Sequence, residues 1–122
     1  MIHIQKGVHF VENILRNIPE TEVLRLSDLV TYASGQVVSK TLIQNEGLGI
    51  TLFAFAKGEG ISTHESKGDA MVTALDGVGC ITIDGQSYEL KAGESIVMPA
   101  HHPHAVHGTE NFKMLLVVAF PS

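Results

Sequence analysis

The sequence contains little cysteine and little positive charge, and each shortage excludes a class of protein. Cys80 is the one cysteine among 122 residues, so no disulfide can form within the chain. Lysine and arginine together number 8 against 13 acidic residues, and the net charge is −5. Because no basic stripe is present to bind phosphates, we expect neither nucleic acid nor an anionic membrane surface as a partner.

Long apolar runs are also missing. No stretch approaches the roughly 18 consecutive apolar residues of a membrane-spanning helix. Residues 1–6 lack the basic region and the long apolar core of a signal peptide, and a single thiol fits a reducing compartment. The sequence therefore leads us to expect a cytoplasmic protein.

Apolar residues and glycine are what the chain has in quantity. Apolar residues make up 44% of the sequence and charged residues 17%, which is too apolar for a disordered chain. The length of 122 residues fits one domain. Nine of the 12 glycines lie between Gly47 and Gly93, where they separate short apolar segments.

These short segments have the composition and the spacing of β-strands. They cover residues 22–26, 36–43, 49–55, 69–75, 78–83, 86–90, 95–98 and 112–120. Most are bounded by glycine, proline or aspartate, and the Asp84-Gly85 pair is a strong signal for a hairpin turn. The recurrence every eight to twelve residues predicts an all-β sandwich or barrel.

The first part of the chain has a different pattern. Apolar residues within 8–18 recur at helical spacing, and Pro19 follows them, so we predict a short amphipathic helix there. The expected organisation is a helix and strand extension over residues 1–35 and a barrel over residues 36–122.

A spaced set of glycine and histidine begins at Gly58. Five residues separate it from His64, and a closing glycine follows at Gly77. This arrangement resembles the first motif of the cupin family, in which glycine and five residues precede His-x-His, a glutamate and a second glycine. Ser66 stands where that motif has its second histidine, and Ala70 stands where it has its glutamate.

A second set begins at Gly93 and resembles the second motif of the same family. Five residues separate Gly93 from Pro99, and His104 occupies the position of the motif histidine. His101 replaces a glycine of the motif, and Gly108 replaces its asparagine. The resemblance covers roughly the C-terminal two-thirds of the chain. It implies a small single-domain cupin, an all-β jelly-roll barrel (a double-stranded β-helix), here with incomplete metal-binding motifs and a short helix before the barrel.

The resemblance also implies a site and a cofactor. Cupins hold a divalent metal with histidines and a carboxylate that point into the barrel, and His64 and His104 are the two of these positions that match here. His102 is the reserve third ligand, and Glu65 or Asp69 could supply a carboxylate if a bulge re-aims the strand. The implied cofactor is one divalent transition metal: zinc, nickel, manganese or iron.

Strand alternation nominates further residues for the inner wall of a ligand pocket. Alternation gives Phe53, Phe55, Val72, Met98, Phe112 and Met114, and Ser66, at the motif position of the second histidine, is also an expected pocket residue. Met98 is the first choice among the apolar ones, because it precedes Pro99 in the second motif and because methionine adapts to irregular pockets. His101 and His107 are expected in exposed turns.

Two functions remain open at this point. The first is a small-molecule-binding cupin barrel with a divalent metal held by two or three histidines. The alternative is a metal-dependent cupin enzyme of the oxygenase, isomerase or cyclase type that acts on a small organic molecule. A homodimer is expected in either case, and a purely structural dimer with a relict site is a third reading. The fold does not determine the substrate.

Overall fold

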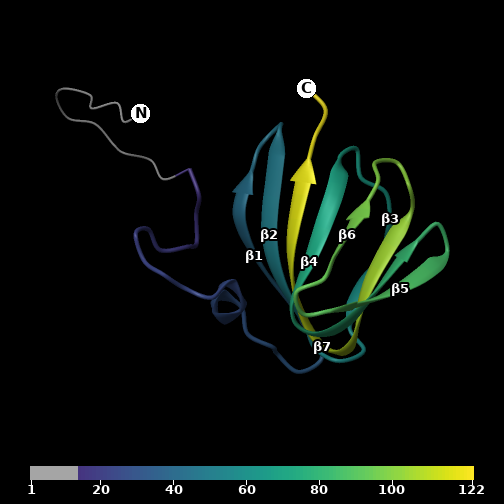
Figure 1. Ribbon diagram of the computed structural model, residues 1–122, viewed down its shortest axis with the longest axis horizontal. Helices are drawn as coiled ribbons and strands as arrows, with labels where there is room; N and C mark the ends of the chain where they lie inside the picture. Colours follow the sequence, from purple (N-terminus) through teal and green to yellow (C-terminus); the bar gives the residue numbers. More distant parts are fainter. Residues whose placement is uncertain (1–13) are drawn as a thin grey trace.

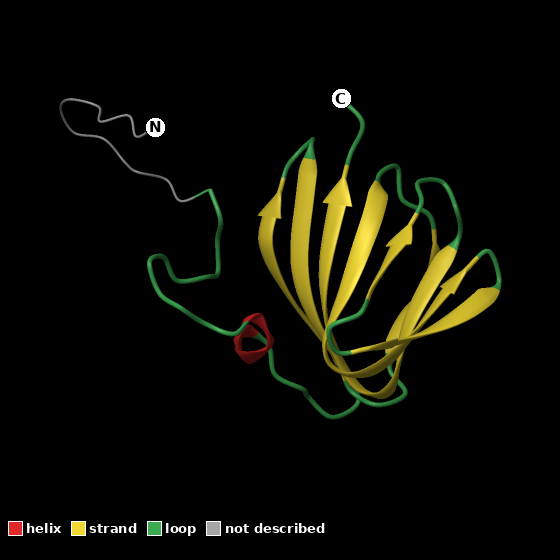
Figure 2. Ribbon diagram, in the orientation of Figure 1, coloured by secondary structure: helices red, strands yellow, loops and turns green. Residues whose placement is uncertain are grey.

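Seven antiparallel strands make up most of the part of the chain that the structure, a computed structural model, describes, which is residues 14–122 (Figure 1). In chain order the strands are β1 (Val37–Gln44), β2 (Leu48–Phe55), β3 (Gly60–His64), β4 (Asp69–Ile83), β5 (Gln86–Lys91), β6 (Ser95–Met98) and β7 (His104–Ala119). One short 3-10 helix, η1 (Leu26–Leu29), precedes them (Figure 2).

The two longest strands, β4 and β7, organise the barrel because each pairs along both of its halves. The second half of β7 pairs with β2 and with the first half of β4. The first half of β7 pairs with β3 and with the second half of β4. The strand order is β1-β2-β7-β4-β5, with β3 beside β7 and β6 beside β4. The sheet therefore curves over on itself into a jelly-roll barrel, as the sequence pattern predicts (Figure 1).

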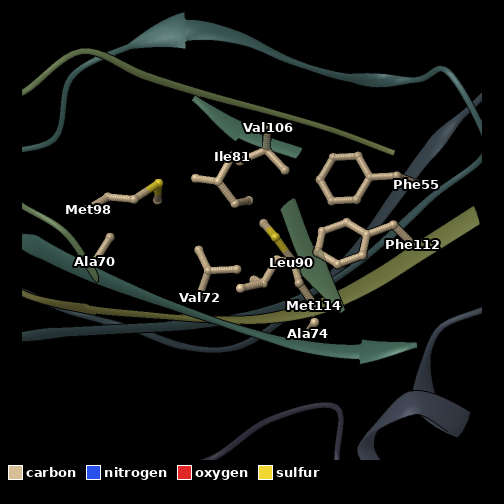
Figure 3. Close-up of a cluster of buried hydrophobic side chains, with 10 residues drawn as sticks. All are labelled: Phe55, Ala70, Val72, Ala74, Ile81, Leu90, Met98, Val106, Phe112 and Met114. Atoms are coloured by element: carbon tan, nitrogen blue, oxygen red, sulfur yellow. The ribbon is translucent and has the colours of Figure 1, made fainter. Parts of the chain in front are cut away.

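The core lies between the two halves of the barrel (Figure 3). Phe55 and Phe112 close one end, with their ring centroids 5.9 Å apart. Gly79 allows this packing, because a Cβ there would overlap the Phe112 ring. Met98 and Ala70 lie at the other end of the cluster (Figure 3).

Residues 69–75 and 78–83 were expected as two strands, and this expectation is wrong, since they form the single strand β4. The Asp76-Gly77 pair makes an irregularity within the strand instead of a turn, with register shifts on either side of Gly77. Gly77 has a φ of 73°, and a Cβ there would overlap the Asn111 carbonyl oxygen of β7. A glycine inside a strand thus marks a bulge here and not a strand end. The Asp84-Gly85 turn is confirmed, with positive φ at both residues.

The N-terminal expectations are also corrected. The predicted helix at 8–18 lies largely outside the described residues, and its described part, residues 14–18, is not helical. Arg16 instead donates its backbone N–H to the carbonyl of Leu42 on the edge strand β1. The strand predicted at 22–26 is absent from the structure, where η1 begins at Leu26 and no strand pairs with this segment. Two-residue alternation alone is too weak a signal without a neighbouring strand.

Residues 26–36 cover the outer face of the barrel with a second apolar cluster. Its buried members are Val30, Leu42, Leu52 and Ala54. Polar contacts hold the segment down, since the Tyr32 hydroxyl donates to the Asp76 carboxylate and Lys113 donates to the Ser27 carbonyl at 2.7 Å. Burial first, and then the hydrogen bond and charge of Asp76, raise the pKa of Tyr32, so its hydroxyl stays protonated and remains a donor.

Replacing Tyr32 by phenylalanine tests this attachment. The change removes the hydrogen bond to Asp76, so we expect the free energy of unfolding to fall by about 1 kcal/mol in urea denaturation. Tyr88→Phe on β5 is the matched control, because that side chain is 39% exposed and lies away from this cluster. Equal effects of the two changes would contradict the account.

Apolar side chains remain exposed on the same outer face. Met71 on β4 and Val97 on β6 are cross-strand partners and are 42% and 55% exposed. At the opposite edge of the sheet from β6, β1 is an edge strand. Exposed apolar patches and open edges favour association, and we propose that a second copy of the chain covers this face in a homodimer.

Light scattering tests the homodimer. We expect a mass of twice the 13.1 kDa of one chain. Met71→Glu should shift the protein to the monomer, because it places a charge in the proposed apolar contact. Ser87→Glu is the control and should leave the dimer intact, because Ser87 is an exposed residue of β5. A monomeric wild-type mass at micromolar concentration would overturn the proposal.

Candidate metal and ligand site

Two histidines meet inside the mouth of the barrel. His64 ends β3 and His104 begins β7, and the two residues are cross-strand partners. Their Nε2 atoms are 3.2 Å apart, and the rings meet edge to face with centroids separated by 4.3 Å. Strand pairing thus joins two residues that lie 40 positions apart in the sequence.

Backbone carbonyls orient both imidazole rings. His64 Nδ1 lies 3.0 Å from the Ser62 carbonyl oxygen, and His104 Nδ1 lies 3.2 Å from that of His102. A carbonyl oxygen only accepts, so each Nδ1 carries a proton in these contacts. With both Nδ1 atoms protonated, the two Nε2 atoms of the neutral rings are both lone-pair acceptors, and they lie only 3.2 Å apart. Two acceptors this close repel each other unless a proton or a metal cation is shared between them.

His104 is the buried member of the pair, with 3% of its surface exposed, whereas His64 is exposed. Burial lowers the pKa of His104, and the nearby His64 lowers it further, while the hydrogen bond to the His102 carbonyl acts in the opposite direction. His104 therefore favours the neutral form, which is the form that binds a metal.

A cavity of about 370 Å³ adjoins the histidine pair. Its apolar lining consists of Phe53, Ile61, Ala70, Met98, Val106, Met114, Leu116, Val118 and Phe120. Its polar lining consists of His64, Glu65, Ser66, Lys67 and His104. The volume falls within the range of small-molecule sites, which combine an apolar wall with a few polar groups.

Sequence alternation found part of this lining. Phe53, Ser66, Met98 and Met114 line the cavity. The other three expected pocket residues, Phe55, Val72 and Phe112, are 0% exposed and belong to the core beneath it. Alternation gives the face of the strand that a side chain occupies but not its depth in the barrel, which explains the difference.

Residues that depart from the motifs have local structural roles. The Ser66 hydroxyl accepts a hydrogen bond from the Gly68 N–H at 3.1 Å and so holds the turn after β3. Asp69, the first residue of β4, accepts from the Ala100 N–H at 2.8 Å, which ties β4 to the loop after β6. His101 has a φ of 65°, a conformation that suits the glycine of the motif. Within residues 14–122, no three histidine, cysteine, aspartate or glutamate side chains cluster as a metal site.

His102, the reserve ligand, is placed elsewhere. Its exposed ring does not line the cavity, and its Nδ1 lies 2.6 Å from an Asp84 carboxylate oxygen in the β4–β5 turn. What His102 supplies to the site is its carbonyl, which orients His104. The sequence pattern did not predict the contact between His102 and Asp84, because it joins two turns that are distant in the chain.

Comparisons with known proteins agree with this geometry. The family model of the cupin domain matches residues 51–120. A conserved protein of unknown function from Streptococcus pyogenes is 45% identical, with 93% of this chain and 99% of that chain covered and a TM-score of 0.90. A cupin superfamily protein from Desulfitobacterium hafniense is 36% identical, with 88% and 98% covered and a TM-score of 0.84.

A third solved structure, a cupin 2 conserved barrel domain protein from Leptotrichia buccalis, is 46% identical, with 79% of this chain and 47% of that chain covered and a TM-score of 0.77. The comparison with curated proteins gives no match. The fold and the site define a cupin-type barrel, and this chain belongs to the cupin domain family.

The lowered pKa of His104 predicts how stability depends on pH in the metal-free protein. The unfolded chain binds a proton at His104 near the ordinary value of 6.5, whereas the native state binds it only at lower pH. Above pH 6.5 the stability that depends on a neutral His104 is fully present. It is lost as the pH falls through the pKa of His104 in the native state. Urea denaturation at several pH values should therefore show a smaller loss on acidification for His104→Gln than for the wild type. Equal pH slopes would contradict this prediction.

Proposed function

We propose that this chain is a small-molecule-binding cupin barrel in which His64 and His104 hold a divalent metal at the polar end of the cavity. The observation that carries the proposal is the pair of Nε2 atoms 3.2 Å apart beside a mostly apolar cavity. Cupin family membership supports it, and the substrate stays open because the fold serves many functions.

The spacing of the two Nε2 atoms matches that of two nitrogens on one metal ion. Nitrogens bound about 2.0–2.1 Å from a tetrahedral ion lie about 3.3 Å from each other, close to the 3.2 Å between these atoms. Each Nδ1 contacts a backbone carbonyl, which is the usual outer contact of a ligating histidine. Zinc, nickel, manganese and iron all accept imidazole nitrogen. The ion would supply a Lewis acid at the polar end of the cavity.

The incomplete protein shell leaves coordination positions open. Two nitrogens fill half of a four-coordinate shell, so water or a bound molecule must provide the rest. Open positions are also what a metal-dependent enzyme needs, and a cupin enzyme of the oxygenase, isomerase or cyclase type is therefore the second candidate. Turnover of a substrate by metal-loaded protein would separate the two candidates.

No helix within residues 14–122 has the length and hydropathy of a membrane span, and a cytoplasmic location stays a prediction.

Metal binding tests the proposed site directly. We expect nickel(II) or zinc(II) titrated into untagged protein to bind once per chain by calorimetry. His64→Ala and His104→Ala should each weaken the affinity by at least about 10-fold, because each removes half of the protein ligands. Acidification should release the ion, since protons compete for the ligating nitrogens.

His107→Ala is the matched control. His107 lies on β7 like His104 but is exposed and does not line the cavity, so its replacement should leave the affinity unchanged. Binding that depends on His107 and not on His64 or His104 would place the metal on the barrel surface and contradict the proposal.

A further inference from the structure

The composition of the cavity also points to the class of molecule that completes the site. We infer that the cavity binds a small carboxylic acid with a second oxygen on the neighbouring carbon, a 2-oxo or 2-hydroxy acid, which chelates the metal while its apolar tail lies against the cavity wall. This inference rests on the proposed function, since it requires the metal at His64 and His104.

Charge is the first argument. Two neutral imidazoles do not compensate the charge of a divalent ion, and Ala70, at the motif position of the glutamate, adds none. Ala70 is 2% exposed and lines the cavity, so no carboxylate projects from that point of the wall. A divalent ion in a mostly apolar cavity without an anionic partner is costly. An anionic ligand therefore restores the charge balance that a glutamate would give.

The number of open positions is the second argument. Two protein nitrogens leave two positions of a four-coordinate shell. One molecule with two adjacent oxygens fills both, and its second contact forms intramolecularly once the first has formed. A carboxylate with a neighbouring carbonyl or hydroxyl oxygen provides this arrangement together with the negative charge.

The cavity wall is the third argument, and it specifies the tail. Phe53, Met98 and Leu116 line the cavity, and they come from three strands, β2, β6 and β7. Figure 3 shows Val106 across the core cluster from Ala70 and Met114, and all three residues also line the cavity. A branched or aromatic tail of a few carbons would replace water here, and a fully polar acid would not use this surface.

The loop after β3 places two opposite charges at the rim. Glu65 and Lys67 both line the cavity and are exposed. Lys67 favours the approach of an anion. Glu65 is the one carboxylate in the lining, so it is the competitor that the experiment must separate from a carboxylate supplied by the ligand.

Calorimetry with three matched acids tests the inference on the wild-type protein. Nickel(II) is titrated with and without 4-methyl-2-oxopentanoate, which carries both the chelating head and the tail. Pyruvate keeps the head but shortens the tail, and 4-methylpentanoate keeps the tail but lacks the second oxygen. We expect the first acid to raise the apparent nickel affinity at least 10-fold, and nickel to raise the affinity for the acid by the same factor. The other two acids should have a several-fold smaller effect.

Two variants sharpen the result. Ala70→Glu returns a carboxylate to the wall, so it should strengthen nickel binding without any acid and reduce the enhancement by 4-methyl-2-oxopentanoate. Ala70→Gln has nearly the same size without the charge, so it should not strengthen nickel binding, and any loss of enhancement that it shares with Ala70→Glu is steric. Glu65→Gln should leave nickel binding within about twofold of the wild type, because the ligand and not Glu65 supplies the anion.

The failures are distinguishable. If nickel binds through His64 and His104 but the three acids affect its affinity equally, the inference is overturned and the proposed function stands. If Glu65→Gln abolishes nickel binding, Glu65 is the missing ligand and the inference is likewise overturned. If the wild type binds no nickel, or if neither histidine replacement weakens binding, both the proposed function and the inference are wrong.

Discussion

The pairing of β3 with β7 is the interaction on which the site depends, because it brings His64 beside His104. β3 has five residues and only one partly buried apolar side chain, Ile61, so few contacts hold it in place. Gly60 permits its close approach to β7, since a Cβ there would overlap the Val106 carbonyl oxygen. A short strand with little apolar burial therefore determines whether the two imidazoles meet. The carbonyls of Ser62 and His102 then contact the two Nδ1 atoms, and the two Nε2 atoms lie 3.2 Å apart.

The departures from the cupin motifs alter the charge of the site more than its shape. Ser66 closes the turn after β3 through its hydrogen bond with Gly68, and Ala70 packs in the core cluster beside Met98. Both positions are thus accommodated structurally, and the barrel loses little by them. Relative to the cupin motifs, the site lacks one imidazole and one carboxylate. The missing negative charge of the carboxylate is the reason why we propose an anionic ligand. The cavity keeps its apolar wall, and in the proposed site the bound ligand supplies the missing negative charge.

Sequence reasoning identified what depends on local pattern and spacing. It predicted strands close to β1, β2, β5 and β6, the turn at Asp84-Gly85, and the two motif positions now occupied by His64 and His104. It missed β3, whose residues are mostly exposed and do not alternate, and the first half of β7. It also missed Lys67, which reaches the cavity from the loop after β3, and it named Glu65 only as a carboxylate that a bulge in the strand could re-aim. Depth in the barrel, loop trajectory and contacts such as Asp84 with His102 depend on tertiary structure, and periodicity does not encode them.

The central claim is that His64 and His104 present their Nε2 atoms to one shared cation. Long-range proton–nitrogen NMR of the imidazoles tests it most directly, by comparison of the protein with and without one equivalent of zinc(II). The account predicts that zinc shifts the Nε2 signals of His64 and His104 together while both Nδ1 atoms keep their protons, and that His102 and His107 do not respond. Coordination through Nδ1 of either ring, or a zinc response at His102 or His107 with none at His64 and His104, would contradict the account.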